Sequence, residues 1–62
     1  MNLRCIIVDD EPLARKGMEE YLADVSYLTH VGSFENALQA AAFLAKEPVD
    51  LMLLDIRMPR VS

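Results

Sequence analysis

Four consecutive apolar residues, Leu51 to Leu54, lie between the acids Asp50 and Asp55, and Pro59 follows closely. Such a run leaves no polar face, which is typical of a strand in a parallel sheet that helices cover on both sides. Pro59 cannot donate a ladder hydrogen bond, so the segment after Asp55 is expected to leave the sheet as a loop. Ligands of open α/β sheets bind outside the carboxyl ends of the strands, and we therefore expect Asp55 at a functional edge.

The amino-terminal segment has the same design. Residues 3–9 are apolar and partly β-branched, which predicts a strand that ends at Asp9 and Asp10. Pro12 suits the first turn of a helix, and Asp10 is placed to cap the exposed N–H groups at its start. An amphipathic helix is expected over 12–24, with apolar residues at helical spacing: Leu13, Gly17, Met18, Tyr21, Leu22 and Val25.

The rest of the chain predicts an α/β order of β-α-β-α-β. Residues 27–33 mix polar and apolar types, as an edge strand does, 35–46 form an alanine-rich helix, and 50–55 form the third strand. Because the second strand is the polar one, we expect it outermost, in the strand order 2-1-3. The first and third strands then share a topological switch point, where Asp9, Asp10 and Asp55 meet.

Composition limits the function classes. The chain has 62 residues, a net charge of −4 and six scattered basic residues, so a direct nucleic-acid surface is not expected. There is no signal-peptide pattern and no apolar run of membrane-spanning length, so no membrane contact is expected. The single cysteine, Cys5, lies in an apolar run and is expected to be a buried thiol, which fits a reducing cytoplasm.

Three carboxylates at one sheet edge repel one another unless a cation joins them. Mg²⁺ is the natural candidate, because it takes hard oxygen ligands and is commonly held by one or two carboxylates. A carboxylate can also attack phosphorus and form an aspartyl phosphate, and the cation screens the charge that repels the phosphoryl group. The acids therefore predict a magnesium site suited to phosphoryl transfer.

These segments carry a family resemblance. Val8-Asp9-Asp10-Glu11-Pro12, followed by Leu54-Asp55-Ile56-Arg57-Met58-Pro59, resembles the receiver domain of two-component response regulators. The stretch Asp-Asp-Glu-Pro-Leu-Ala-Arg at 9–15 looks more like regulators with a LytTR-type DNA-binding output domain than like chemotaxis regulators. The resemblance implies the amino-terminal half of a flavodoxin-like (CheY-like) doubly wound sheet, with 1–62 a partial receiver domain.

Carried over by position, the resemblance implies that Asp55 is the phosphoacceptor for a sensor histidine kinase. It implies that Asp10 binds Mg²⁺ directly, that Asp55 is also a metal ligand, that Asp9 binds through a water, and that the backbone carbonyl of Arg57 completes the protein ligands. The family's fourth and fifth strands, whose Thr or Ser and Lys respond to the phosphoryl group, have no counterpart in these residues.

The resemblance also implies that the kinase docks on the first helix. The face that carries Leu13, Ala14 and Met18 is the candidate contact surface. The other interpretation is that Leu13 and Met18 belong to the core.

Three alternatives remain open at this point. The strand at 50–55 has an unpaired edge, so the chain is expected to form a homodimer or larger assembly through that edge. The first alternative is that the chain only self-associates in this way and takes no part in phosphotransfer. An aspartate-nucleophile phosphatase of the haloacid dehalogenase type wants an acid where Arg57 stands. A nucleotide- or flavin-binding half-domain wants glycines where Asp9, Asp10 and Glu11 stand, because backbone N–H groups cradle phosphate.

Overall fold

The computed structural model describes residues 2–55, with Asp55 described by its backbone alone. The elements follow the expected order, and no boundary moves by more than two residues, as in the second helix (expected 35–46). They are β1 (Leu3–Asp9), α1 (Pro12–Ala23), β2 (Leu28–Phe34), α2 (Ala37–Leu44) and β3 (Leu51–Asp55). Neither helix in this part of the chain has the length and apolarity needed to cross a membrane.

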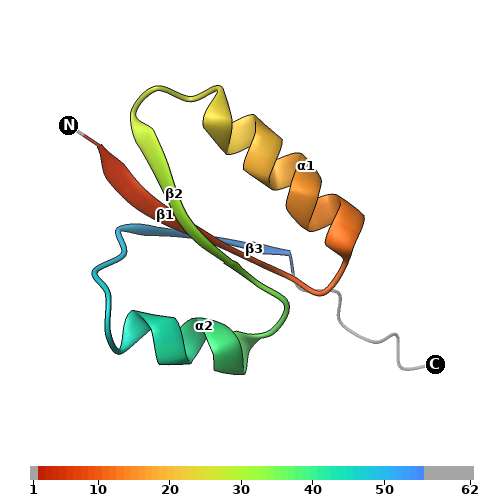
Figure 1. The fold of residues 1–62 in the computed structure, drawn as a ribbon, viewed down its shortest axis with the longest axis vertical. Coiled ribbons are helices and arrows are strands. Elements are labelled where there is room, and N and C mark those ends of the chain that lie inside the picture. Colours follow the sequence, from red (N-terminus) through yellow and green to blue (C-terminus); the bar gives the residue numbers. More distant parts are fainter. Residues whose placement is uncertain (1, 56–62) are drawn as a thin grey trace.

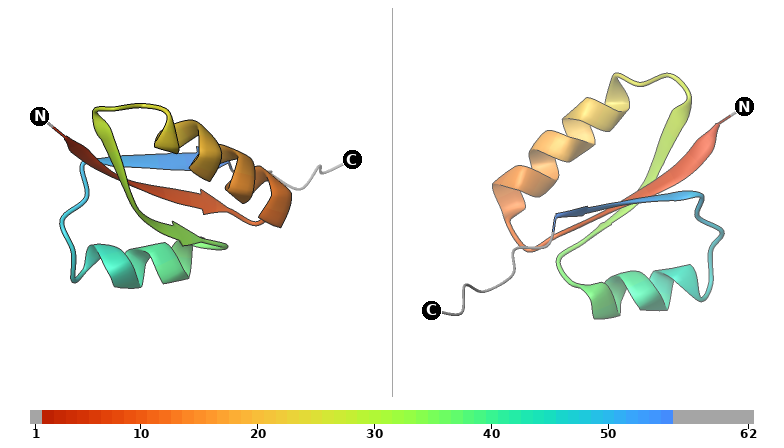
Figure 2. Two further views of the ribbon diagram at one scale, coloured as in Figure 1. Left: turned by 45° about the horizontal axis from the view of Figure 1, so that its top comes forward. Right: turned by 180° about the vertical axis from the view of Figure 1, so that it is seen from behind.

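The three strands form one parallel sheet in the order β2-β1-β3, which confirms the predicted order. The two helices lie on opposite sides of this sheet (Figure 1), and the turned views in Figure 2 show the same layers. This arrangement is the amino-terminal half of a flavodoxin-like doubly wound sheet.

Alternating side chains of β1 supply both halves of the core, because successive residues of a strand point to opposite faces. On the α1 side, Cys5 and Ile7 are fully buried against Leu22, which is the only buried residue of α1. On the α2 side, Ile6 and Val8 pack against Ala40. The prediction that Cys5 is a buried thiol is therefore confirmed.

The third strand is less buried than expected for an apolar run that helices cover on both sides. Among the described residues β3 is an edge strand, and β1 is the one with neighbours on both sides. Leu51, Met52 and Leu54 are 37%, 39% and 49% exposed, so their apolarity is not explained by burial within this chain. Asp50 ties the start of β3 to β1: its Oδ2 accepts the Arg4 N–H at 2.9 Å, and its own N–H donates to the Arg4 carbonyl at 2.8 Å.

The predicted cap of α1 was wrong. Glu11 is the N-cap residue and makes no side-chain cap bond, whereas Asp10 is exposed. The Glu11 N–H instead donates to Oδ1 of Asp9 at 2.9 Å, the local bond by which an aspartate accepts from the backbone two residues further on. The predicted apolar stripe of α1 is also only partly buried, since Leu13 and Tyr21 are 79% and 67% exposed.

A bulge in β2 shifts the register with β1, from Cys5 opposite His30 to Ile6 opposite Gly32. The extra residue allows His30 and Ser33 to meet: His30 Nε2 lies 2.8 Å from Ser33 Oγ, which donates to Glu19 Oε2 at 2.6 Å. This polar contact holds α1 against β2. Just beyond the bulge, the ring of Phe34 lies over Gly32 and packs on Phe43, with the ring centroids 5.2 Å apart.

Gly32→Ala is expected to destabilise the chain. A Cβ at this position meets Cζ of Phe34 at 2.9 Å and Cε2 at 3.0 Å, so the ring must move away from Phe43. Overpacking of this kind costs about 1–3 kcal/mol. Gly17→Ala is the matched control, because a Cβ placed at Gly17 has no atom within 4 Å. Alanine in place of glycine within a helix stabilises the fold by about 0.5–1 kcal/mol. Urea denaturation of both variants checks the opposite signs; equal stabilities would contradict the packing analysis.

Candidate functional site

The candidate site lies at the carboxyl end of β1. Asp9 is the last residue of the strand and is only 2% exposed, whereas Asp10 follows it in the turn and is exposed. The turn continues through Glu11 into α1. The first two predicted acids therefore share one turn but differ in environment.

Asp55 reaches the same edge from β3. It is the last residue of that strand, and its Cα is the register partner of Asp9 in the parallel β1–β3 pair. Neighbouring strands lie about 4.8 Å apart, so the backbone brings these two acids side by side. Arg57, whose carbonyl the sequence analysis assigned to the metal, lies outside the described residues.

One oxygen of Asp9 has no hydrogen-bond partner among the described residues. Oδ1 accepts the Glu11 N–H, but Oδ2 is buried and receives no hydrogen bond from the described residues. Leaving a buried charged acceptor unpaired costs more than the roughly 1–3 kcal/mol of a neutral group. A hard cation at the turn would supply the missing partner, because Mg²⁺ prefers carboxylate and water oxygens. The residues at this edge therefore fit a magnesium ion.

Within residues 2–54, the side chains of the structure do not form a group of three metal-ligating residues. Asp9 and Asp10 are neighbours there, and the third expected carboxylate, Asp55, is described by its backbone only. The pairing of Asp9 with Asp55 in the sheet is accordingly the observation that links the two acidic segments.

Sequence reasoning missed one residue at this edge. Arg15, in the first turns of α1, is half-buried, and its Nη1 donates to the main-chain carbonyl of Asp9 at 2.8 Å. The sequence signal is a basic residue six positions after the strand-ending acid, which a helix start brings back over the strand end.

The residues expected to meet a kinase divide into two kinds. Leu13 is 79% exposed, so the interpretation of Leu13 as a core residue was wrong. Met18 is half-buried and packs against the cluster of Cys5 and Leu22, so its side chain belongs in part to the core. Ala14 is half-buried between them. The exposed end of this face is therefore the end beside the acid turn.

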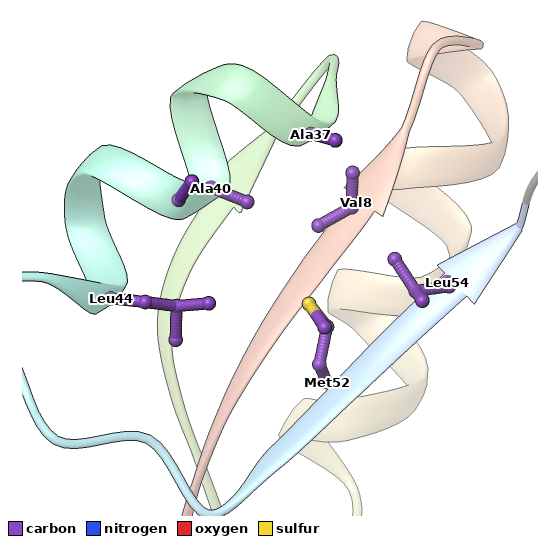
Figure 3. Close-up of a pocket in the computed structure, with 7 residues that line it drawn as sticks. Val8, Ala37, Ala40, Leu44, Met52 and Leu54 are labelled. Atoms are coloured by element: carbon purple, nitrogen blue, oxygen red, sulfur yellow. The ribbon is translucent and has the colours of Figure 1, made fainter.

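An apolar groove of about 180 Å³ lies on the other side of the sheet, between α2 and β3 (Figure 3). Its walls are the residues Val8, Ala37, Ala40, Ala41, Leu44, Met52 and Leu54. The groove carries no catalytic side chain. It adjoins the strand whose outer edge is unpaired among the described residues.

Cys5 has no part in the site chemistry. Burial, and then the nearby negative charge of Asp50, raise the pKa of its thiol. The neutral thiol lies in the core, with its sulfur 3.7 Å from the carbonyl of Leu3. A thiol with a raised pKa is a poor nucleophile, so its role is packing.

The fold and the acid turn define a signalling receiver, and comparison with known families agrees: the response regulator receiver domain matches residues 5–62. The chain belongs to this family. Receiver domains of two-component systems are signalling domains, and they generally bind Mg²⁺ at an acidic pocket. The family assignment made from Asp9, Asp10 and Asp55 is thus confirmed, while the role of each residue is not tested by it.

Individual relatives are also similar. The chain is 40% identical over 60 residues to the transcriptional regulatory protein BtsR of Escherichia coli (strain K12), covering 97% of this chain and 25% of that protein. It is 43% identical over 61 residues to the transcriptional regulatory protein AruR of Pseudomonas aeruginosa, covering 90% of this chain and 24% of the relative. The chain thus spans about a quarter of the length of these curated relatives. No solved structure matches it at a significant level.

Asp9→Asn is expected to stabilise the chain in the absence of divalent metal. The amide keeps the oxygen that accepts the Glu11 N–H and replaces the buried charge by a neutral group. The expected gain is about 1–2 kcal/mol, because an unpaired buried charge costs more than an unpaired amide.

Thermal unfolding in EDTA and in Mg²⁺ measures this effect. Mg²⁺ should raise the Tm of the wild-type chain more than that of Asp9→Asn. Glu20→Gln is the control, because it removes the same charge from an exposed position of α1. A variant that is less stable than wild type in EDTA would contradict the cost assigned to Oδ2.

Proposed function

We propose that this chain is the phosphoacceptor part of a two-component response regulator, and that Asp55 accepts a phosphoryl group from a sensor histidine kinase. One observation carries the proposal: Asp55 is the register partner of Asp9, whose Oδ2 is buried without a partner among the described residues. On this proposal the protein is a signalling domain and not a stand-alone enzyme.

The proposed chemistry is an in-line transfer between two side chains. A carboxylate oxygen of Asp55 attacks the phosphorus, and the bond between phosphorus and the kinase imidazole nitrogen breaks, with the electron pair returning to that nitrogen. When bound, Mg²⁺ supplies the positive charge that offsets the repulsion between the carboxylates and the phosphoryl oxygens. We assign Asp10, Asp55 and the Arg57 carbonyl as protein ligands of Mg²⁺, with Asp9 acting through a water.

The kinase is proposed to dock on the face of α1 that carries Leu13, Ala14 and Met18. The exposure of Leu13 supports this, because a leucine that is 79% exposed at the start of a helix is accessible to a partner protein. The same residue lies in the first turn of α1, close to the acid turn. A kinase that contacts Leu13 therefore brings its histidine near the carboxyl edge of the sheet.

We propose that the longer protein carries a DNA-binding output domain of the LytTR type. This part rests on the resemblance at residues 9–15 and on the names of BtsR and AruR as transcriptional regulatory proteins. Residues 1–62, with a net charge of −4, are not proposed to bind nucleic acid themselves. A cytoplasmic location belongs to the same proposal and is supported by the free, buried thiol of Cys5.

Asp55→Asn in the complete protein is expected to abolish labelling by the cognate kinase and by acetyl phosphate, because the amide cannot act as the nucleophile. Radiolabelled phosphate retained on the protein is the measurement. Asp50→Asn is the control, since this aspartate lies at the opposite end of β3, beside Arg4. Undiminished labelling of Asp55→Asn would rule out the assigned phosphoacceptor.

The same labelling assay on Leu13→Ala distinguishes a role in kinase docking from a role in the phosphorylation reaction itself. This variant is expected to slow transfer from the kinase about tenfold or more, as loss of an interface anchor worth about 2 kcal/mol does. Labelling by the small donor acetyl phosphate should not change, because no protein surface is needed. Equal slowing with both donors would place Leu13 in the phosphorylation site and not in a docking face.

A second proposal concerns the chain of 62 residues by itself: it self-associates through the outer edge of β3. The observations that support this are the exposed side chains of Leu51, Met52 and Leu54 and the adjoining apolar groove (Figure 3). An unpaired apolar edge strand is a template for another chain. A second copy supplies both a strand for the edge and apolar side chains for the groove.

Light scattering at micromolar concentration tests self-association. The wild-type chain is expected to be a dimer or larger, and Met52→Lys, which places a charge in the groove, is expected to be a monomer. Leu38→Lys is the matched control, because Leu38 is 83% exposed on α2 but does not line the groove. A monodisperse wild-type monomer would exclude the proposal.

A further inference from the structure

Three hydrogen bonds close a ring around the acid turn. The Glu11 N–H donates to Asp9 Oδ1 at 2.9 Å, the Arg15 N–H donates to the Glu11 carbonyl at 3.0 Å, and Arg15 Nη1 donates to the Asp9 carbonyl at 2.8 Å. The last bond comes from a side chain that reaches back from α1 to the end of β1. Asp10 lies between the anchored residues Asp9 and Glu11.

The position of Arg15 is unusual for a cation. It lies within the first turns of α1, where the helix dipole disfavours positive charge by about 0.3–1 kcal/mol, and it is half-buried. The N-cap residue Glu11 makes no side-chain cap bond. The turn is held instead by Asp9 Oδ1, which accepts the Glu11 N–H, and by the Arg15 guanidinium, which donates to the Asp9 carbonyl. The conformation of the turn therefore depends on Arg15 more than on its own capping residue.

We infer that Arg15 is a positioning residue for Mg²⁺: it holds the turn so that the carboxylates of Asp9 and Asp10 are presented to one ion. This inference rests on the proposed function, since it presumes the magnesium site. The guanidinium acts through the Asp9 carbonyl and does not touch the metal. Groups that orient metal ligands in this way change metal affinity about 10- to 100-fold when they are removed.

A purely electrostatic role predicts the opposite sign. A positive charge near the acids repels Mg²⁺, so its removal should tighten metal binding by a modest factor, which salt reduces. Positioning predicts that removal weakens binding. The direction of the change in Mg²⁺ affinity thus distinguishes the two roles of Arg15 without any measurement of phosphotransfer.

The experiment compares Arg15→Gln with Lys16→Gln. Lys16 is the next residue of α1, is exposed, and makes no hydrogen bond to the described part of the chain, so its substitution removes the same charge without releasing the turn. Mg²⁺ affinity is measured by isothermal titration calorimetry at a temperature where thermal unfolding shows each variant to be folded. Arg15→Lys is added because it keeps the charge and loses the planar fork.

The expected result is a Mg²⁺ Kd at least tenfold higher for Arg15→Gln than for Lys16→Gln, with Arg15→Lys also weaker than wild type. In metal-free protein, the Glu11 amide proton should exchange with solvent faster in Arg15→Gln than in Lys16→Gln. An Arg15→Gln affinity equal to or tighter than that of Lys16→Gln overturns the inference and leaves the proposed function intact. A wild-type chain that binds no Mg²⁺ overturns the magnesium site itself, and the inference with it.

Discussion

The parallel pairing of β1 with a strand on each side is the interaction on which this structure depends. Its residues Cys5 to Asp9 are all buried, and Cys5 to Val8 alternate between the cluster under α1 and the cluster under α2. Since the same strand supplies both cores and ends at the acid turn, the packing of the domain and the geometry of the site share one backbone. A change in the register of β1 would therefore move both core clusters and the acid turn at once.

The end of β1 is also where stability and function conflict. Burying Asp9 with Oδ2 unpaired is unfavourable for an isolated fold, and replacing it by an apolar residue would remove the cost. Two hydrogen bonds reduce this cost. Asp9 Oδ1 accepts the Glu11 N–H, and the main-chain carbonyl of Asp9 accepts a bond from Arg15 Nη1. Oδ2 remains without a hydrogen-bond partner among the described residues, and Asp55, the register partner of Asp9, ends β3 at the same edge.

Much of this could be predicted from residue order. The alternation of apolar strands with helical patterns predicts β-α-β-α-β, and the polar character of 27–33 predicts the edge strand that the structure has as β2. The two aspartates that end apolar runs predict a shared edge, because parallel strands place their carboxyl ends together. What failed was local: Asp10 was predicted to cap α1, yet Asp9 anchors the turn, and Leu13 proved to be exposed.

The sequence by itself therefore determined the elements, their order in the sheet and the family, since these follow from the periodicity of apolar residues and from the spacing of three acids. Only the tertiary structure decided which acid is buried, that its Oδ2 lacks a partner, and that Arg15 returns to the strand end. It also decided that β3 keeps an exposed apolar side. Those facts depend on which surfaces meet in space, and residues six or 46 positions apart meet only after the helices have packed on the sheet.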